Sequence, residues 1–216
     1  MTTFTTEDRV AIEQGSKEWH LSRLGKVTAS RIADVLSKGK SGESASRKNY
    51  RTELVVQRLT GVPGESFTNA AMEWGTTTEP LARIAYEAKM GIFVNQVAFI
   101  DHPSISNFGC SPDGLIADDG LLEIKCGNTT THIDWLLSEK APSRYIPQMQ
   151  CQMACTGRKW VDFCSFDPRI DSDLQLFIVR VERDEEYIEN MEKEVKIFLQ
   201  EVDDLYNQLM AKKGVK

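Results

Sequence analysis

Apolar positions along this chain follow two periods, one of three to four residues and one of two. The longer period predicts helices, and short apolar runs between turn residues predict strands. The longest helical pattern recurs from Ile188 to Leu209 and predicts one helix over residues 184–212, whose apolar seam packs on the protein's own sheet or on a neighbouring subunit. Further helices are expected over residues 16–24, 30–36, 46–59, 129–137 and 144–155.

One more helix is expected after Trp74, ending at Gly91. Leu81, Ile84 and Ala85 keep helical spacing there and are expected to face the core. Strands are expected over residues 93–100, 115–117, 121–124, 160–166 and 174–181. The chain has 216 residues, 41% of them hydrophobic, and no long polar tract, so we expect a single domain over residues 1–216.

The strands on either side of residues 118–120 carry the charged residues of greatest interest. The Asp-Asp-Gly sequence between them is typical of a hairpin turn. Strand side chains alternate faces, so Glu123 and Lys125 share one face. Both lie in an apolar strand, where an uncompensated charge is costly.

The length of the hairpin loop decides whether Asp113 joins these two residues. With a three-residue loop and Gly120 in the left-handed conformation, Ala117 lies opposite Leu121 and Asp113 falls opposite Lys125. The three polar side chains then emerge on one face. A two-residue turn would send Asp113 to the other face, so a site here predicts the longer loop.

Two converging carboxylates repel each other unless a cation neutralises them, and hard oxygen ligands favour Mg²⁺ or Mn²⁺ over zinc. The neighbouring Lys125 can orient or deprotonate the attacking water, or stabilise charge on a scissile phosphate. This chemistry is phosphodiester hydrolysis. The alternative is an exposed hairpin with ordinary acids and a solvated lysine.

The hairpin motif, Ser-Pro-Asp-Gly followed by Leu-Glu-Ile-Lys-Cys, resembles the core of the PD-(D/E)XK nucleases. It resembles more closely the lambda-type phage exonucleases of the YqaJ viral recombinase family. Further matches run in the family's order from about Glu13 to Asp184 and cover most of the chain. They are Glu18-Trp19-His20, Arg23-Leu24-Gly25, Thr28-Ala29-Ser30, Trp74-Gly75 with Glu79, Gln148-Met149-Gln150 and Phe166-Asp167-Pro168-Arg169.

The resemblance implies an α/β fold with a restriction-endonuclease-like core, in which helices flank a central mixed sheet and a long helix ends the chain. It also implies a Mg²⁺-dependent exonuclease that degrades one strand of double-stranded DNA from 5′ to 3′. Such an enzyme prefers 5′-phosphorylated ends, releases 5′ mononucleotides and leaves a 3′ single strand for recombination. Family members form ring-shaped homotrimers around DNA and act with a phage single-strand annealing protein.

Catalytic roles follow from the same resemblance. Asp113, Glu123 and the Ile124 carbonyl would ligate Mg²⁺, or Mn²⁺ in its place, and Glu79 would help to hold a second ion. Lys125 would activate water in a two-metal displacement. Considered alone, Glu79 near a helix start is better explained as a plain cap or a surface charge.

DNA-binding roles are implied for four more residues. Arg23 and Ser30 match the pair that grips the terminal 5′ phosphate, although a plain surface arginine is the alternative for Arg23. Met72 would help to wedge the duplex open, or else fill the core. Gln148 and Gln152 lie one helical turn apart, so either could reach a bound phosphate or the attacking water. The resemblance selects Gln148, and related nucleases often have tyrosine at the position of Gln152.

Charge is unevenly distributed along the chain. The net charge of −6 is unusual for a protein that binds phosphates. Residues 23–58, however, contain nine bases and three acids, whereas residues 182–216 contain ten acids and six bases. We interpret this as a basic inner region that holds DNA within an acidic exterior, with a solvated pair of basic helices as the alternative. In that interpretation the loop over residues 38–44 is flexible. The helix after it carries four basic side chains that are available to DNA phosphates, Arg47, Lys48, Arg51 and Arg58.

Cysteine and histidine add no site of their own. The five cysteines form no CxxC pair, so neither a disulfide framework nor a zinc finger is expected, and Cys151 and Cys155 are interpreted as buried core residues. His20, His102 and His132 lack metal-binding spacing and are interpreted as structural. Without a signal-like start or a membrane-length apolar run, the chain is expected in the cytoplasm of a bacterial host and away from membranes.

Two other functions fit parts of the pattern. A sequence-specific endonuclease could share the same core and would cleave covalently closed circles. A non-catalytic module could instead bind DNA ends and recruit the annealing protein. The complete set of Asp113, Glu123 and Lys125 argues against the second alternative, and chelator-sensitive release of nucleotides from linear duplex would separate it from an enzyme.

Overall fold

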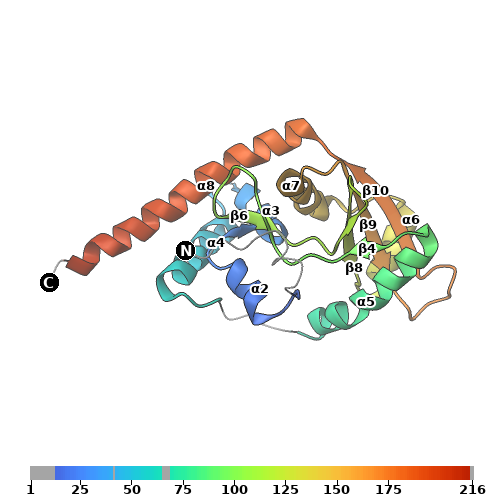
Figure 1. Cartoon of the computed structure of the whole chain (residues 1–216). Coiled ribbons are helices and arrows are strands. Elements are labelled where there is room, and N and C mark those ends of the chain that lie inside the picture. The colour runs from blue at the N-terminus through green and yellow to red at the C-terminus, as the bar shows by residue number, and fades with distance from the viewer. Residues whose placement is uncertain (1–12, 41, 65–68, 215–216) are drawn as a thin grey trace.

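A five-stranded mixed sheet forms the centre of the protein (Figure 1). The computed structural model describes residues 13–40, 42–64 and 69–214. Strands β8 and β9 are parallel and the other neighbours are antiparallel. The order across the sheet is β10 (Leu176–Glu182), β9 (Trp160–Phe166), β8 (Gly120–Lys125), β7 (Gly114–Ile116) and β4 (Val94–Asn95).

Helices cover both faces of this sheet (Figure 1). On one face, Leu121 of β8 and Phe163 of β9 pack with α7 (Ile146–Thr156) and α8 (Glu185–Ala211). On the other face, Leu122 and Ile124 of β8 pack with α5 (Ala70–Met90). The predicted α/β class, with a central mixed sheet flanked by helices and a long C-terminal helix, is confirmed.

Most of the remaining elements lie at one end of the sheet, whereas α6 (Thr129–Ser138) lies beside β9 (Figure 1). A three-stranded sheet joins β1 (Val27–Thr28), β6 (Phe108–Cys110) and β5 (Ile100–Asp101). The other helices are α2 (Lys17–Ser22), α3 (Ile32–Leu36) and α4 (Ala45–Thr60), with 3-10 turns at Ala29–Arg31, Ser143–Tyr145 and Lys212–Gly214.

Capping residues place the helix starts close to the predicted positions. Ser16 accepts a hydrogen bond from the Trp19 amide, and Asp184 accepts one from the Tyr187 amide. The C-terminal seam is buried from Ile188 to Val202, but Leu209 is exposed. Helix α8 has 27 residues, yet neither it nor any other helix in the described part of the chain is long and apolar enough to cross a membrane.

The buried face of α5 differs from the predicted one. Leu81 and Ile84 are 53% and 61% exposed, whereas Thr78, Ala82 and Tyr86 are buried. The reason is a polar contact across the core: the Tyr86 hydroxyl donates to Asp162 on β9 at 2.7 Å. Apolar spacing alone selected the wrong side of the helix. The side that carries Tyr86 is buried instead, because the tyrosine hydroxyl has a hydrogen-bond partner in the core.

The register of the β7–β8 hairpin also differs from the prediction. The loop has three residues, as expected, but it spans residues 117–119, since Ile116 pairs with Gly120. Ala117, at φ 43°, takes the left-handed conformation that was expected of Gly120. Extending the pairing by one residue places Asp113 opposite Glu123 rather than Lys125. A shift of two positions preserves the side-chain face, so the convergence of the three residues survives.

Contacts from outside the hairpin set this register. Arg158 Nη1 donates to the carbonyls of Ile116, Ala117 and Gly120 at 3.0, 2.8 and 2.7 Å. A Cβ atom on Gly120 would lie 2.1 Å from the Trp160 ring. Glycine is therefore required at position 120 by the close approach of an indole.

Two other segments differ from the predicted secondary structure. The expected strand over residues 93–100 consists of two short strands, β4 and β5, in different sheets. Residues 38–44, expected to be a flexible loop, include the paired strands β2 (Lys38–Gly39) and β3 (Gly42–Glu43), while Ser41 lies outside the described residues.

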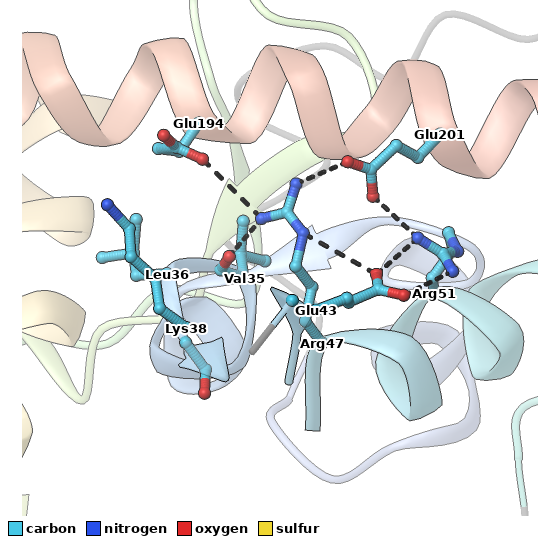
Figure 2. Close-up of a pocket in the computed structure, with 10 residues that line it drawn as sticks. Val35, Leu36, Lys38, Glu43, Arg47, Arg51, Glu194 and Glu201 are labelled. Carbon is cyan, nitrogen blue, oxygen red and sulfur yellow. Dashed lines mark hydrogen bonds and ion pairs between the residues drawn. The ribbon is translucent and has the colours of Figure 1, made fainter. Parts of the chain in front are cut away.

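Most of the basic side chains of α4 are bound within the protein. Figure 2 shows Arg47 and Arg51 reaching the acids of α8, with Glu201 between them at 2.8 and 2.9 Å. Arg51 also pairs with Glu43 of β3, and Arg58 pairs with an acid further along α8, Asp203. The prediction that Arg47, Arg51 and Arg58 are available to DNA phosphates is therefore wrong, because the acidic C-terminal helix neutralises them.

His102 and His132 are buried, whereas His20 is exposed. His102 accepts hydrogen bonds from the backbone amides of Ser104 and Ile105, and His132 bonds to the Ser165 hydroxyl. All five cysteines are free, and Cys151 and Cys155 are buried.

Candidate active site

Glu123 lies at the centre of the candidate site and is fully buried on the face of β8 that packs against α7. Its Oε1 atom accepts a hydrogen bond from Gln148 Nε2 at 2.6 Å and a charge-assisted one from Lys125 Nζ. Its Oε2 atom accepts a hydrogen bond from Gln152 Nε2 at 2.5 Å. A buried carboxylate needs such donors, and here one ammonium and two amides supply them.

Asp113 is half-buried just before β7, and its Oδ2 atom accepts a hydrogen bond from the Ile124 amide at 2.6 Å. Burial and the negative charge of Glu123 raise the pKa of Asp113 well above its ordinary value, although Lys125 opposes the shift. Burial is the larger cause of this raised pKa, and repulsion between the two neighbouring carboxylates adds to it. This is the arrangement that a cation would relieve.

Lys125 is the positive charge between these acids. Burial lowers its pKa, but the attraction of Glu123 and Asp113 is larger, so the pKa of Lys125 rises above its ordinary value. Its ammonium also lies 5.1 Å from the centre of the Tyr145 ring. A protonated lysine favours charge stabilisation or orientation of water over removal of a proton.

Arg23 and Ser30 lie in the same pocket, which has a volume of about 200 Å³ and is also lined by Asp113, Glu123, Lys125 and Gln148. Arg23 Nη2 is 3.5 Å from Ser30 Oγ, and the guanidinium lies 3.9 Å from the centre of the Trp19 ring. Burial lowers the pKa of Arg23 from its ordinary value. The structure therefore brings six predicted residues together, from α2, the 3-10 turn, the β7–β8 hairpin and α7.

A larger pocket of about 600 Å³ adjoins this one. Both pockets are lined by Trp19, Arg23, Thr28 and Ser30. Met72 lines the larger pocket and is 52% exposed, so it is not an ordinary core methionine. The two pockets therefore meet at these four shared side chains.

Glu79 lies in the middle of α5, not near a helix start as expected, and it does not line the pocket of Asp113 and Glu123. It is half-buried and pairs with Arg83 at 3.0 Å. Burial raises the pKa of Glu79, Arg83 and Lys125 lower it, and Glu123 raises it further, which places Glu79 within the electrostatic reach of the central acids. Within residues 13–40, 42–64 and 69–214, no three or more His, Cys, Asp and Glu side chains gather as a metal site.

The residues at the hairpin nevertheless fit a divalent cation of the Mg²⁺ type. Such an ion is usually bound by one or two carboxylates and completes its shell with water and substrate phosphates. Asp113 and Glu123 provide two hard oxygen ligands, and their repulsion contributes to the raised pKa of Asp113.

Two contacts of the site were not predicted from the sequence, one made by Gln152 and one made by Trp19. Gln152 holds Glu123 as closely as Gln148 does, and its own Oε1 atom is buried without a partner among the described residues. The one-turn spacing of the two glutamines was the available signal. The indole of Trp19 donates to Ser111 Oγ at 3.0 Å and so links the arginine pocket to the loop before Asp113, a contact between distant segments that no local pattern contains.

Comparison with known proteins supports one family. The model of the YqaJ-like viral recombinase domain matches residues 18–159, which is more than half of the chain. Two crystal structures of LHK-Exo share 50% identity with this chain over 92% of it and 98% of their own chain, with a TM-score of 0.86. One is described as an alkaline exonuclease from Laribacter hongkongensis and the other as a complex with dAMP.

A phage-related exonuclease from Haemophilus somnus 129PT has the same fold at 18% identity, with a TM-score of 0.64 over 88% of this chain and 96% of its own. A search of curated protein sequences finds no significant match.

Proposed function

Because this chain belongs to the YqaJ-like viral recombinase family, we propose that it is a metal-dependent exonuclease that degrades double-stranded DNA from 5′ to 3′. The observation that carries the proposal is the shared pocket of Arg23, Ser30, Asp113, Glu123 and Lys125. It puts a candidate site for a strand end beside a candidate site for hydrolysis. The product would be a 5′ mononucleotide, and the dAMP complex of LHK-Exo supports a product of that class.

Each residue has a distinct role in the proposed reaction. Asp113, Glu123 and the Ile124 carbonyl would hold Mg²⁺, or Mn²⁺ in its place, and Glu79 would help to hold a second ion. A bound divalent ion would supply charge neutralisation at the scissile phosphate and a more acidic attacking water. Lys125 would stabilise the charge that develops on the phosphate.

In this mechanism Glu123 Oε1 would contact both its hydrogen-bond donors and the cation. Lys125 and Gln148 both donate to that atom, so a cation that takes one of its lone pairs competes with them. Gln152 would keep Oε2 in place, and the Lys125 ammonium would contact the phosphate. Gln148 would then be free to orient the attacking water or the phosphate.

The 5′ to 3′ direction would follow from the Arg23 and Ser30 pair. A terminal 5′ phosphate carries more negative charge than an internal one, and a half-buried guanidinium beside a hydroxyl favours it. With the end phosphate bound there, the next phosphodiester bond would lie near Asp113 and Glu123. Met72, exposed in the adjoining pocket, would help to separate the strands.

The proposed assembly and setting come from the family resemblance. We infer a ring-shaped homotrimer around DNA, acting with a phage single-strand annealing protein in the cytoplasm of a bacterial host. The 3′ single strand left by digestion would be the substrate for that partner. Sedimentation of the full chain with and without a duplex would test the oligomer.

One experiment tests the activity. Linear duplexes with 5′-phosphate or 5′-hydroxyl ends, labelled on either strand, are incubated with Mg²⁺ or with EDTA, beside a covalently closed circle. We expect 5′ mononucleotides from the 5′ end, faster from phosphorylated ends, and none with EDTA. Arg23→Ala should mainly remove the preference for phosphorylated ends.

Each alternative predicts a different result from the same reactions. Cleavage of the closed circle would indicate an endonuclease, and end binding without any product would indicate a recruitment module. Mononucleotides released first from the 3′ end would refute the proposed direction. If Arg23→Ala lowered the rate equally on 5′-phosphate and 5′-hydroxyl ends, the phosphate-binding role would be refuted.

A further inference from the structure

Arg169, which follows β9, connects three separate parts of the protein. Its Nε and Nη2 atoms donate to the two oxygens of fully buried Asp167 at 2.7 and 2.9 Å. Nη2 also donates to the carbonyl of Gly127, two residues after Lys125, at 3.1 Å. The face of the guanidinium lies 4.3 Å from the centre of the Trp74 ring on α5. One side chain thus joins the ends of β9 and β8 to a helix.

Trp74 is the main anchor of the first half of α5. The other residues of the first two turns are exposed or have no large side chain to bury, and the buried residues of α5 begin at Thr78. The indole N–H of Trp74 has no hydrogen-bond partner in the part of the chain that the structure describes. Stacking against Arg169 therefore orients this ring.

Pro80 makes that anchor important. It lies inside α5 and has no amide hydrogen to donate to the carbonyl one turn earlier. A helix can bend at such a point, so the rigid second half of α5, held by Ala82 and Tyr86, does not by itself fix the direction of the first half. The contacts of Trp74 and of the buried Thr78, which both precede Pro80, have to do so.

The half of α5 before Pro80 carries Glu79 and Met72. We propose that Arg169 is a positioning residue: by stacking on Trp74 it holds this half of α5 in place and so fixes how far Glu79 lies from the acids of the hairpin. The inference rests on the proposed function, in which Glu79 helps to hold a second ion. It adds a residue that touches neither DNA nor the ion.

Arg180 provides a matched control. Like Arg169, it makes two bonds to a buried aspartate, Asp162, at 2.8 and 2.9 Å, and lies over an indole, that of Trp160. The side chains of Arg169 and Arg180 are both 42% exposed. The contacts of Arg180 with Asp162 and Trp160, however, join β9 to β10 within the sheet and do not include the first half of α5.

The test measures Mn²⁺ binding to the full chain by calorimetry, in the absence of DNA. Arg169→Ala should weaken the Glu79-dependent binding about tenfold, the usual effect of removing a residue that orients a metal ligand. Trp74→Ala should do the same, and Trp74→Phe, which keeps an aromatic face, should restore most of the affinity. Arg180→Ala should leave the affinity unchanged even where it lowers the Tm.

The double variant Arg169→Ala/Trp74→Ala should bind Mn²⁺ no more weakly than either single variant, because both changes break one contact. Wild-type affinity in Arg169→Ala and Trp74→Ala, with Glu79→Gln impaired, would overturn the inference alone. Wild-type affinity in Glu79→Gln would instead remove the proposed role of Glu79. If Arg169→Ala does not fold, Trp74→Ala against Trp74→Phe decides, since both leave the Asp167 pair intact.

Discussion

Lys125 shows how far single side chains constrain the chemistry. Its ammonium contacts Glu123, and the two acids raise its pKa by more than burial lowers it. A lysine held in the charged state is a poor proton acceptor at neutral pH but a strong partner for a phosphate. The local electrostatics therefore favour the second of the two roles that the sequence left open.

Lys125→Ala should abolish most of the cleavage. We expect the single-turnover rate on linear duplex to fall by at least about 100-fold, as for other groups that stabilise charge in a transition state. Binding to DNA ends, measured by fluorescence anisotropy with Ca²⁺, should change little. Lys193→Ala, which removes an exposed lysine of α8, is the control and should keep the wild-type rate. Full activity in Lys125→Ala would refute the role.

Asp167 offers a test by pH. Burial would raise its pKa, but hydrogen bonds from Arg169 and Thr129 outweigh it and lower the pKa to about 2. The unfolded value is about 3.9, so this interaction stabilises the fold fully above about pH 4 and is lost as the pH falls through about 2.

Asp167→Asn should therefore lower the free energy of unfolding by about 1–2 kcal/mol at pH 7, less than the full pKa shift because Arg169 is partly exposed. The difference between variant and wild type, measured in urea, should shrink as the pH is lowered from 4 toward 2. A difference that stays constant over this range would show that the ionised state of Asp167 contributes nothing.

At the scale of elements, the catalytic hairpin depends on a residue outside it. Arg158, at the start of β9, donates from one nitrogen to three carbonyls of the loop and its flanks. Lys159 adds a backbone hydrogen bond to the Asp119 carbonyl at 2.8 Å. The register that places Asp113 opposite Glu123 is thus imposed by the neighbouring parallel strand.

Arg158→Ala should loosen the hairpin without unfolding the protein. Losing these hydrogen bonds should cost about 1–2 kcal/mol of the free energy of unfolding. Amide hydrogen exchange should accelerate in residues 114–123 and remain slow in β10. Lys159→Ala removes only an exposed ion pair with Asp119 and should change neither quantity measurably. Unchanged exchange in Arg158→Ala would show that turn residues alone set the register.

For the whole molecule, the distribution of charge has a structural cause. The basic helix α4 and the acidic helix α8 lie side by side (Figure 2). Ion pairs between them neutralise part of the positive charge of one segment with the negative charge of the other. Lys48 differs from its neighbours, because it is exposed and has no ion pair among the residues described. The DNA-binding charge of this helix is therefore smaller than the sequence indicates.

Arg47→Ala and Lys48→Ala should have opposite signatures. Arg47→Ala removes a buried partner of Glu201, which keeps its ion pair with Arg51, and should lower the free energy of unfolding by about 2 kcal/mol, with little effect on the salt dependence of DNA binding. Lys48→Ala should change stability by less than about 0.5 kcal/mol but reduce the slope of log affinity against log salt by about one. The reverse pattern would mean that Arg47 leaves α8 to bind DNA.

Much of this protein could be predicted from local signals. Caps such as Ser16 and Asp184 determined where helices begin, and strand alternation placed Glu123 and Lys125 on one face. A loop with an odd number of residues placed Asp113 on the same face. Loop length decides which face a residue takes, even when it does not decide the exact residue pairs. The family motif identified six residues that share one pocket.

Tertiary structure decided what depends on partners distant in sequence. The buried side of α5, the exact pairing of the hairpin and the loss of Arg47, Arg51 and Arg58 to α8 each rest on a contact between segments far apart in the chain. Period and composition describe one segment at a time, so they cannot show which of two apolar stripes finds a partner or which charge is already neutralised. Only the folded arrangement supplies that information.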